Sequence, residues 1–123
     1  MAPCIGNGEK FVISAGDSCS VEGGCIRSPN YPSDYDSSDC TITVIGNQEL
    51  ILMANTFETE AGYDKLTVGG TDYHGNNGPN GVTVGPGEVI SWNADSSTHR
   101  GGWEVCEGGA CYILKVTVWC ECV

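Results

Sequence analysis

The sequence predicts an all-β protein, a small β-sandwich stabilised by disulfide bonds, and three observations support this prediction. Polar and apolar residues alternate along several short segments, as they do in strands that are buried on one face. Turn-forming clusters of Gly, Asn and Pro separate these segments. Eight cysteines occur in only 123 residues. No segment has the spacing of apolar residues that an amphipathic helix requires, so we expect little or no helix.

Seven segments alternate or are continuously apolar and are predicted to be strands: 11–13, 41–45, 49–57, 64–68, 87–93, 103–106 and 111–119. The run 49–57 is the longest apolar one, which predicts a central strand buried on both faces. The segment 111–119 alternates throughout, which predicts a single strand. Trp92 and Trp103 lie in neighbouring predicted strands and are expected in the core.

The chain is strongly acidic, with five basic residues, sixteen acidic residues and a net charge of −11. Nucleic-acid binding is therefore not expected, because phosphate contacts require Lys and Arg. The charge favours cations and basic protein surfaces as partners. The longest apolar stretch, 50–54, is too short to cross a bilayer, so no membrane insertion is expected. The first residues have no signal-peptide pattern, and we expect a mature or trimmed chain.

The cysteine content predicts a disulfide framework and a secreted, extracellular protein, because disulfides persist in oxidising compartments. Structural zinc is the alternative reading of eight cysteines. No two cysteines have C-x-x-C spacing, and neither His74 nor His99 has ligand spacing to a cysteine, which disfavours zinc. In the predicted C-terminal strand Cys120 and Cys122 share a face, so we expect them to bond to different partners.

Three groups of residues follow one another along the chain. They are Ser28-Pro29-Asn30-Tyr31-Pro32 with Tyr35 and Cys40; Phe57, Glu60, Tyr63-Asp64 and Leu66-Thr67-Val68; and 90–97 with Gly102-Trp103. In this order they resemble the calcium-binding branch of the CUB domain family over residues 19–106. The resemblance implies a jelly-roll-like β-sandwich of two mainly antiparallel sheets, in agreement with the periodicity. Residues 1–18 are then an N-terminal extension with a short strand, and 107–123 are an extra C-terminal strand and Cys-rich tail packed on the same domain.

The resemblance also implies a Ca²⁺ site at one end of the sandwich. The carboxylate ligands would be Glu60, Asp64 and Asp95. Ser97 would offer its carbonyl oxygen, and Thr98 stands where the family often has Asn. Tyr35 would support the acidic cluster. Hard oxygen ligands of this kind are those that Ca²⁺ prefers. A dication would remove the mutual repulsion of three carboxylates and join three loops.

The sequence departs from the family pattern within this site. Glu60 and Asp64 are only four residues apart, whereas the family usually separates them by a disulfide loop whose two cysteines are absent here. The alternative reading is that these acids are solvated loop residues that bind no ion.

The resemblance implies one disulfide, between Cys19 and Cys40. The six remaining cysteines allow fifteen pairings. A bond between Cys25 and Cys106 and a bond from Cys4 to the C-terminal strand are both open. The cysteines of undetermined pairing are therefore Cys4, Cys25, Cys106, Cys111, Cys120 and Cys122.

The function that follows is an extracellular, non-catalytic binding module whose Ca²⁺-organised acidic site recognises a Lys or Arg of a protein partner. No catalytic sequence motif is present, and Asp95, Ser97 and His99 are too close in sequence to form a triad. His99 and His74 are expected to be exposed loop residues. Two alternatives stay open: a spermadhesin-like protein that binds glycans, and a structural subunit that self-associates into a polymer through its terminal strands.

Overall fold

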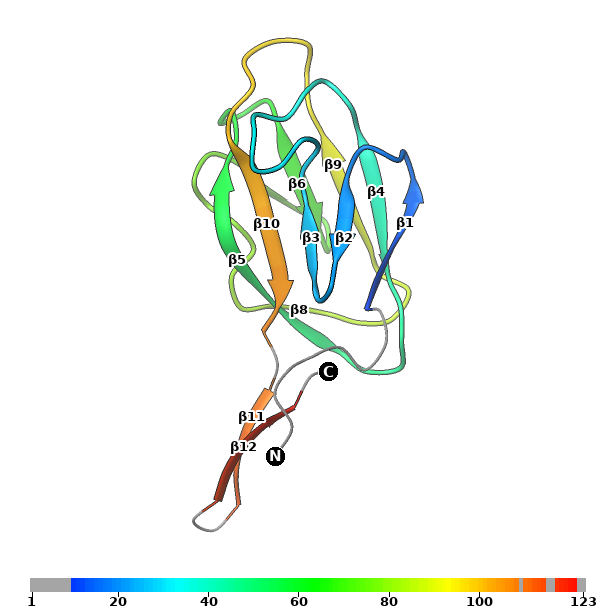
Figure 1. The fold of residues 1–123 in the computed structure, drawn as a ribbon, viewed down its shortest axis with the longest axis vertical. Helices are drawn as coiled ribbons and strands as arrows, with labels where there is room; N and C mark the ends of the chain where they lie inside the picture. Colours follow the sequence, from blue (N-terminus) through cyan, green and yellow to red (C-terminus); the bar gives the residue numbers. More distant parts are fainter. Residues whose placement is uncertain (1–9, 109, 115–116, 122–123) are drawn as a thin grey trace.

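The computed structural model describes residues 10–108 and the backbone of 110–114 and 117–121. Strands make up its regular structure (Figure 1). In chain order they are β1 Phe11–Ala15, β2 Ser20–Glu22, β3 Cys25–Arg27, β4 Cys40–Val44, β5 Leu50–Glu58, β6 Lys65–Val68, β7 Thr71–Tyr73, β8 Val82–Val84, β9 Val89–Asn93, β10 Gly102–Glu107, β11 Ala110–Leu114 and β12 Thr117–Glu121. The predicted all-β class is confirmed.

Two five-stranded antiparallel sheets form the sandwich. The first sheet has the order β1-β4-β9-β6-β7 and the second has the order β2-β3-β10-β5-β8. Apart from the pairs β2-β3 and β6-β7, neighbouring strands in each sheet are not consecutive in the chain, so hydrogen bonds between distant segments define the fold. This arrangement confirms the predicted sandwich of two antiparallel sheets.

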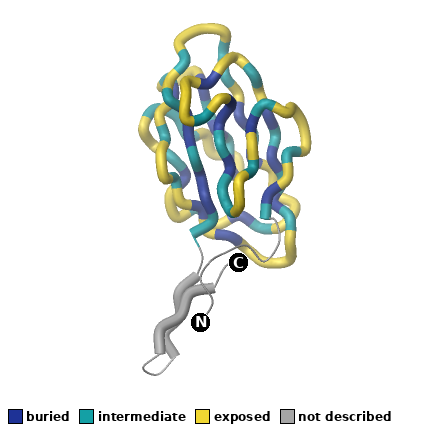
Figure 2. The backbone as a smooth tube through the Cα atoms, viewed as in Figure 1, coloured by how far each residue is buried: buried dark blue, intermediate teal, exposed yellow. Residues whose placement is uncertain are grey.

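The core lies between the two sheets and is built from alternate residues of the strands (Figure 2). In β4 the side chains of Cys40, Ile42 and Val44 point inward and are buried. Trp92 and Trp103 are fully buried, with ring centroids 5.7 Å apart in an edge arrangement, which confirms their predicted place in the core. Each large apolar side chain that is removed from water contributes about 1.5–3 kcal/mol.

The strand over 49–57 is present as β5, but the prediction that both its faces are buried is wrong. Leu50 and Leu52 point into the core, whereas Ile51 and Met53 are 38% and 45% exposed. The second sheet has one face against the core and the other toward solvent, so a run of apolar residues does not place both faces inside.

The predicted single strand over 111–119 is also wrong, because the chain forms two strands there. β11 and β12 pair with each other as a hairpin, with Cys111 opposite Cys120, and with neither sheet of the sandwich. Alternation alone does not reveal a reversal, because both strands of a hairpin have the same period. The predictions for Cys4 and Cys122 lie outside the described residues, and the expected division of the chain at 18 and 106 stays a prediction.

Two disulfides are present in the described part of the chain. The Cys19–Cys40 bond implied by the resemblance joins the residue before β2 to the start of β4, with a Cα–Cα distance of 6.0 Å. The Cys25–Cys106 bond joins two residues that face each other on β3 and β10. Two disulfides in a small domain indicate an oxidising compartment. No described helix has the length and apolar character needed to cross a membrane.

Candidate metal site

Three carboxylates that are separate in sequence meet at one end of the sandwich, the upper end in Figure 1. Glu60 follows the end of β5, Asp64 precedes β6, and Asp95 follows β9. One oxygen atom of each carboxylate lies within 4.8 Å of the others. The two sheets bring these residues together, because β5 belongs to the second sheet and β6 and β9 are neighbours in the first.

Asp64 is the central member of this cluster and is completely buried. Its Oδ2 accepts a hydrogen bond of 2.6 Å from the hydroxyl of Tyr35, and its Oδ1 accepts one of 2.8 Å from the backbone N–H of Asp95. A buried carboxylate requires such donors, since an unpaired charge in the interior is costly. These two bonds fix the Asp64 carboxylate against the loop that carries Asp95.

Tyr35 supports the cluster from the loop between β3 and β4. Its ring packs edge-on against Trp92 with centroids 4.9 Å apart, and its backbone N–H donates to the carbonyl of Arg100. The Tyr35 hydroxyl donates to Asp64 and accepts from the backbone N–H of Glu60 at 3.0 Å. Burial, and then the hydrogen bond to Asp64, raise the pKa of Tyr35 above its ordinary value, so the phenol stays protonated and remains a donor.

A tight turn brings Glu60 and Asp64 together despite their short separation. The carbonyl of Glu60 accepts hydrogen bonds from the backbone N–H groups of Tyr63 (3.2 Å) and Asp64 (3.0 Å). Gly62 lies inside the turn with φ of 84°, a left-handed conformation that a residue with a Cβ rarely adopts. The turn thus places both carboxylates on one side, although no disulfide loop separates them.

Ser97 and Thr98 are exposed members of the loop that carries Asp95. The backbone N–H of Ser97 donates to Asp95 Oδ1 at 3.1 Å, and Thr98 has a positive φ of 56°. The first contact holds the Asp95 side chain within its own loop. The roles of Ser97 and Thr98 as ligands stay predictions.

The chemistry of the cluster fits a divalent cation. Glu60 Oε1 is buried and accepts no hydrogen bond from the described residues. Burying a carboxylate oxygen without a partner is unfavourable, and two further carboxylates within 4.8 Å add electrostatic repulsion. A cation that prefers hard oxygen ligands would satisfy this oxygen and offset the repulsion, and Ca²⁺ is such a cation. Glu60, Asp64 and Asp95 could therefore hold a metal ion.

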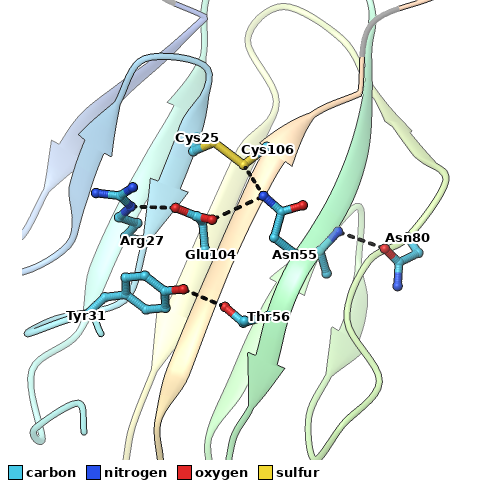
Figure 3. The surroundings of a disulfide bond; sticks show 9 residues. Cys25, Arg27, Tyr31, Asn55, Thr56, Asn80, Glu104 and Cys106 are labelled. Carbon is cyan, nitrogen blue, oxygen red and sulfur yellow. Dashed lines mark hydrogen bonds and ion pairs between the residues drawn. A yellow bond between two sulfur atoms is a disulfide. The ribbon is translucent and has the colours of Figure 1, made fainter. Parts of the chain in front are cut away.

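A second cluster of metal-ligating residue types lies on the outer face of the second sheet (Figure 3). It consists of Cys25, Glu104 and Cys106. The two sulfurs are bonded to each other, and Glu104 accepts hydrogen bonds from Arg27 Nε at 2.7 Å and Asn55 Nδ2 at 3.1 Å. These donors, Asn55 and then Arg27, lower the pKa of Glu104. Since all three groups already have partners, this cluster offers no metal site.

The structure places both histidines differently from the prediction that they are solvent-facing. His99 is half-buried against the ring of Tyr35, with centroids 5.5 Å apart, and its Nε2 lies 3.2 Å from the hydroxyl of Ser37. His74 is also half-buried, and its Nδ1 accepts a hydrogen bond of 3.0 Å from the backbone N–H of Gly62. No local sequence signal reveals these contacts, because each joins loops that are distant in the chain.

No protein-family model matches this chain, and no solved structure matches it. The described residues form a disulfide-bonded β-sandwich with a buried acidic cluster that could hold a metal ion.

Proposed function

We propose that this protein is an extracellular, non-catalytic binding module of the CUB type, in which Ca²⁺ organises the acidic end of the sandwich. One observation carries the proposal. Three carboxylates from two loops, 59–64 and 94–101, lie within 4.8 Å of one another, and the buried Oε1 of Glu60 has no partner among the described residues. The order of the CUB-like motifs along the chain is independent support.

Glu60, Asp64 and Asp95 would supply the carboxylate oxygens. The ion contributes positive charge that offsets the repulsion between these groups. The protein contributes the geometry: Tyr35 and the backbone N–H of Asp95 hold Asp64, and the turn at 60–64 holds Glu60 beside it. Binding energy would then be used to order the loops at this end of the sandwich.

The charge balance of the site supports a basic partner group. Three carboxylates carry more negative charge than one dication neutralises, so a cation can still be attracted to the occupied site. A Lys or Arg side chain of an extracellular protein fits this requirement. Extracellular modules commonly bind Ca²⁺ with Kd of about 10⁻⁴ to 10⁻³ M, which requires the calcium concentration outside cells. The two disulfides agree with this location.

The test is thermal unfolding with Ca²⁺ and with a chelator. At a Ca²⁺ concentration about 100 times Kd, we expect stabilisation of about 2.7 kcal/mol and a rise in Tm of about 10 °C. Asp95→Ala should abolish this rise, because it removes a ligand from an accessible loop. The matched control is Asp72→Ala, since Asp72 lies on the edge strand β7, where its carboxylate accepts a hydrogen bond from Thr67 and pairs with Lys65.

If wild-type protein shows no calcium-dependent change in Tm, the metal-centred function is wrong. If calcium binds but an immobilised Lys-rich partner is not retained, the ion is structural and the partner proposal is wrong. Retention of glycans that persists in chelator would instead favour the glycan-binding alternative.

A second candidate function is self-assembly through terminal strands, and the place of β1 favours it. β1 lies at an edge of the first sheet, with β4 as its neighbour on one side. An edge strand can pair with a strand of a second copy. Sedimentation over a range of protein concentrations tests this proposal: a constant monomer mass would overturn it.

A further inference from the structure

His74 contacts the turn that carries two of the candidate ligands. The turn at 60–64 has two hydrogen bonds to the Glu60 carbonyl, from the N–H groups of Tyr63 and Asp64, and the N–H of Gly62 is not one of their donors. That N–H donates to Nδ1 of His74 at 3.0 Å. His74 directly follows β7, an edge strand of the first sheet, so the contact joins the turn to the end of this strand.

The residue after His74 holds the base of the same turn. The N–H of Thr59 donates to the carbonyl of Gly75 at 2.9 Å, and the N–H of Gly75 donates to the hydroxyl of Thr59 at 2.9 Å. The Thr59 hydroxyl in turn donates to the backbone carbonyl of Asp64 at 3.0 Å. The pair His74–Gly75 is thus bonded to the turn both before Glu60 and between Glu60 and Asp64.

This arrangement has a consequence for ion binding. Glu60 and Asp64 repel each other when no cation is present, and a free turn would relieve the repulsion by opening. A turn that is held in place keeps the carboxylates near the spacing that an ion requires, so less conformational entropy is lost on binding. The rigidity of a site is one of the factors that set calcium affinity in proteins.

We propose that His74 is a positioning residue of the candidate metal site, which fixes the Gly62 peptide and thereby the relative position of Glu60 and Asp64. This inference rests on the proposed Ca²⁺ site and concerns how the site is held. The hydrogen-bond acceptor Nδ1 carries this role, because it is the atom that contacts the turn. Packing of the ring alone would not hold the Gly62 peptide in place.

Two substitutions separate the acceptor from the ring. His74→Phe keeps a ring of similar size and removes the acceptor, whereas His74→Asn removes the ring and keeps an acceptor, Oδ1, near the position of Nδ1. We expect His74→Phe to weaken the Kd for Ca²⁺ about fivefold to tenfold, because the Gly62 peptide would then lose its backbone freedom only when the ion binds. We expect His74→Asn to stay within about twofold of wild type. Asn76→Ala, an exposed residue of the same loop, is the control.

Calcium titration by calorimetry measures Kd, and amide hydrogen exchange of Gly62 in the metal-free protein gives a second readout. Exchange should be faster in His74→Phe and near wild type in His74→Asn.

Equal affinity of wild type and His74→Phe overturns the positioning role and leaves the proposed function intact. Equal weakening by both substitutions also overturns it, because the ring would then be the cause. If His74→Phe does not fold, His74→Asn decides: wild-type affinity supports the role and weakened affinity overturns it. If wild-type protein binds no calcium, the proposed function fails and this inference fails with it.

Discussion

Two clusters of potential metal ligands, one of Cys25, Glu104 and Cys106 and the other of Glu60, Asp64 and Asp95, have different partners in this protein. On the outer face of the second sheet, Glu104 lies beside a closed disulfide and accepts hydrogen bonds from Arg27 and Asn55 (Figure 3). At the end of the sandwich, Glu60 has a buried oxygen that accepts no hydrogen bond from any described residue. Both clusters bring three potential ligand atoms within 4.8 Å. The ligand atoms are therefore equally close in the two clusters. The clusters differ in whether each carboxylate already has hydrogen-bond donors.

The neighbours of each carboxylate distinguish a structural cluster from a ligand site. A carboxylate that already has a guanidinium and an amide donor gains little from an added cation. A carboxylate beside two others gains a great deal, because the cation replaces repulsion by attraction. Reductant should therefore change the stability of the protein through the Cys25–Cys106 bond on the outer face of the second sheet. Calcium and chelator should change it through the acidic cluster at the end of the sandwich.

The largest expected effect is the loss of the Cys25–Cys106 bond, which crosses 81 residues of sequence. In the chain-entropy description, Cys25→Ala with Cys106→Ala lowers the free energy of unfolding by about 4.5 kcal/mol. Removing Cys19–Cys40, which crosses 21 residues, should cost about 3.4 kcal/mol. Denaturant unfolding measures both. The calcium affinity of the Cys25/Cys106 variant should stay within about twofold of wild type, and a larger change would contradict the separation of the two clusters.

An intermediate effect is expected from Tyr35→Phe. This change keeps the ring against Trp92 but removes the hydroxyl, so Asp64 Oδ2 loses a donor and the N–H of Glu60 loses its acceptor. We expect a loss of about 1.5–3 kcal/mol in the metal-free protein, because the abandoned groups are buried. Tyr31→Phe is the matched control: its hydroxyl contacts Thr56 at an exposed position, and its effect should be within about 0.5 kcal/mol. Equal effects in the two variants would show that Tyr35 contributes only its ring.

The smallest expected effect is a dependence on pH that comes from two carboxylates of β10, Glu107 and Glu104. Burial raises the pKa of Glu107 above its ordinary 4.5, and its Oε2 has no hydrogen-bond partner among the described residues. The stability that Glu107 contributes is therefore present below pH 4.5 and is lost as the pH rises through the raised pKa. For Glu104, whose pKa is lowered, the contribution is present above pH 4.5 and is lost as the pH falls through the lowered pKa.

Glu107→Gln and Glu104→Gln test these opposite signs, each against wild type. Unfolding free energy measured between pH 3 and 7 should rise relative to wild type toward neutral pH for Glu107→Gln. It should fall relative to wild type toward neutral pH for Glu104→Gln. The same sign for both variants would contradict the assignment of one satisfied and one unsatisfied carboxylate.

The strands were predictable where alternation extends over four or more residues, as in β4, β6 and β9. β2, β3, β7 and β8 were missed because three residues are too few to define a period. The apolar run 49–57 predicts β5 correctly but also predicts that both its faces are buried. This second prediction is wrong because composition does not say what covers each face of a strand. The reversal between β11 and β12 was missed because alternation continues through a hairpin.

The candidate site divides in the same way. Glu60, Asp64, Asp95 and Tyr35 could be proposed from the sequence because their residue types and order resemble a known pattern. His74 could not, because a lone histidine in a Gly- and Asn-rich loop gives no indication of the backbone group that it contacts. Its partner, Gly62, is near in space only because β6 and β7 form a hairpin that returns the chain to this end of the sheet.

By itself the sequence determined the all-β class, the acidic charge, the oxidised cysteines and the residue types of the acidic cluster, because composition and short-range periodicity depend on neighbours along the chain. The tertiary structure alone decided that Cys25 bonds to Cys106 and that Glu104 is paired while Glu60 Oε1 is not. It also decided that His74 holds the turn at 60–64. These contacts depend on which strands lie side by side, and pairing between strands distant in sequence is a property of the whole folded chain.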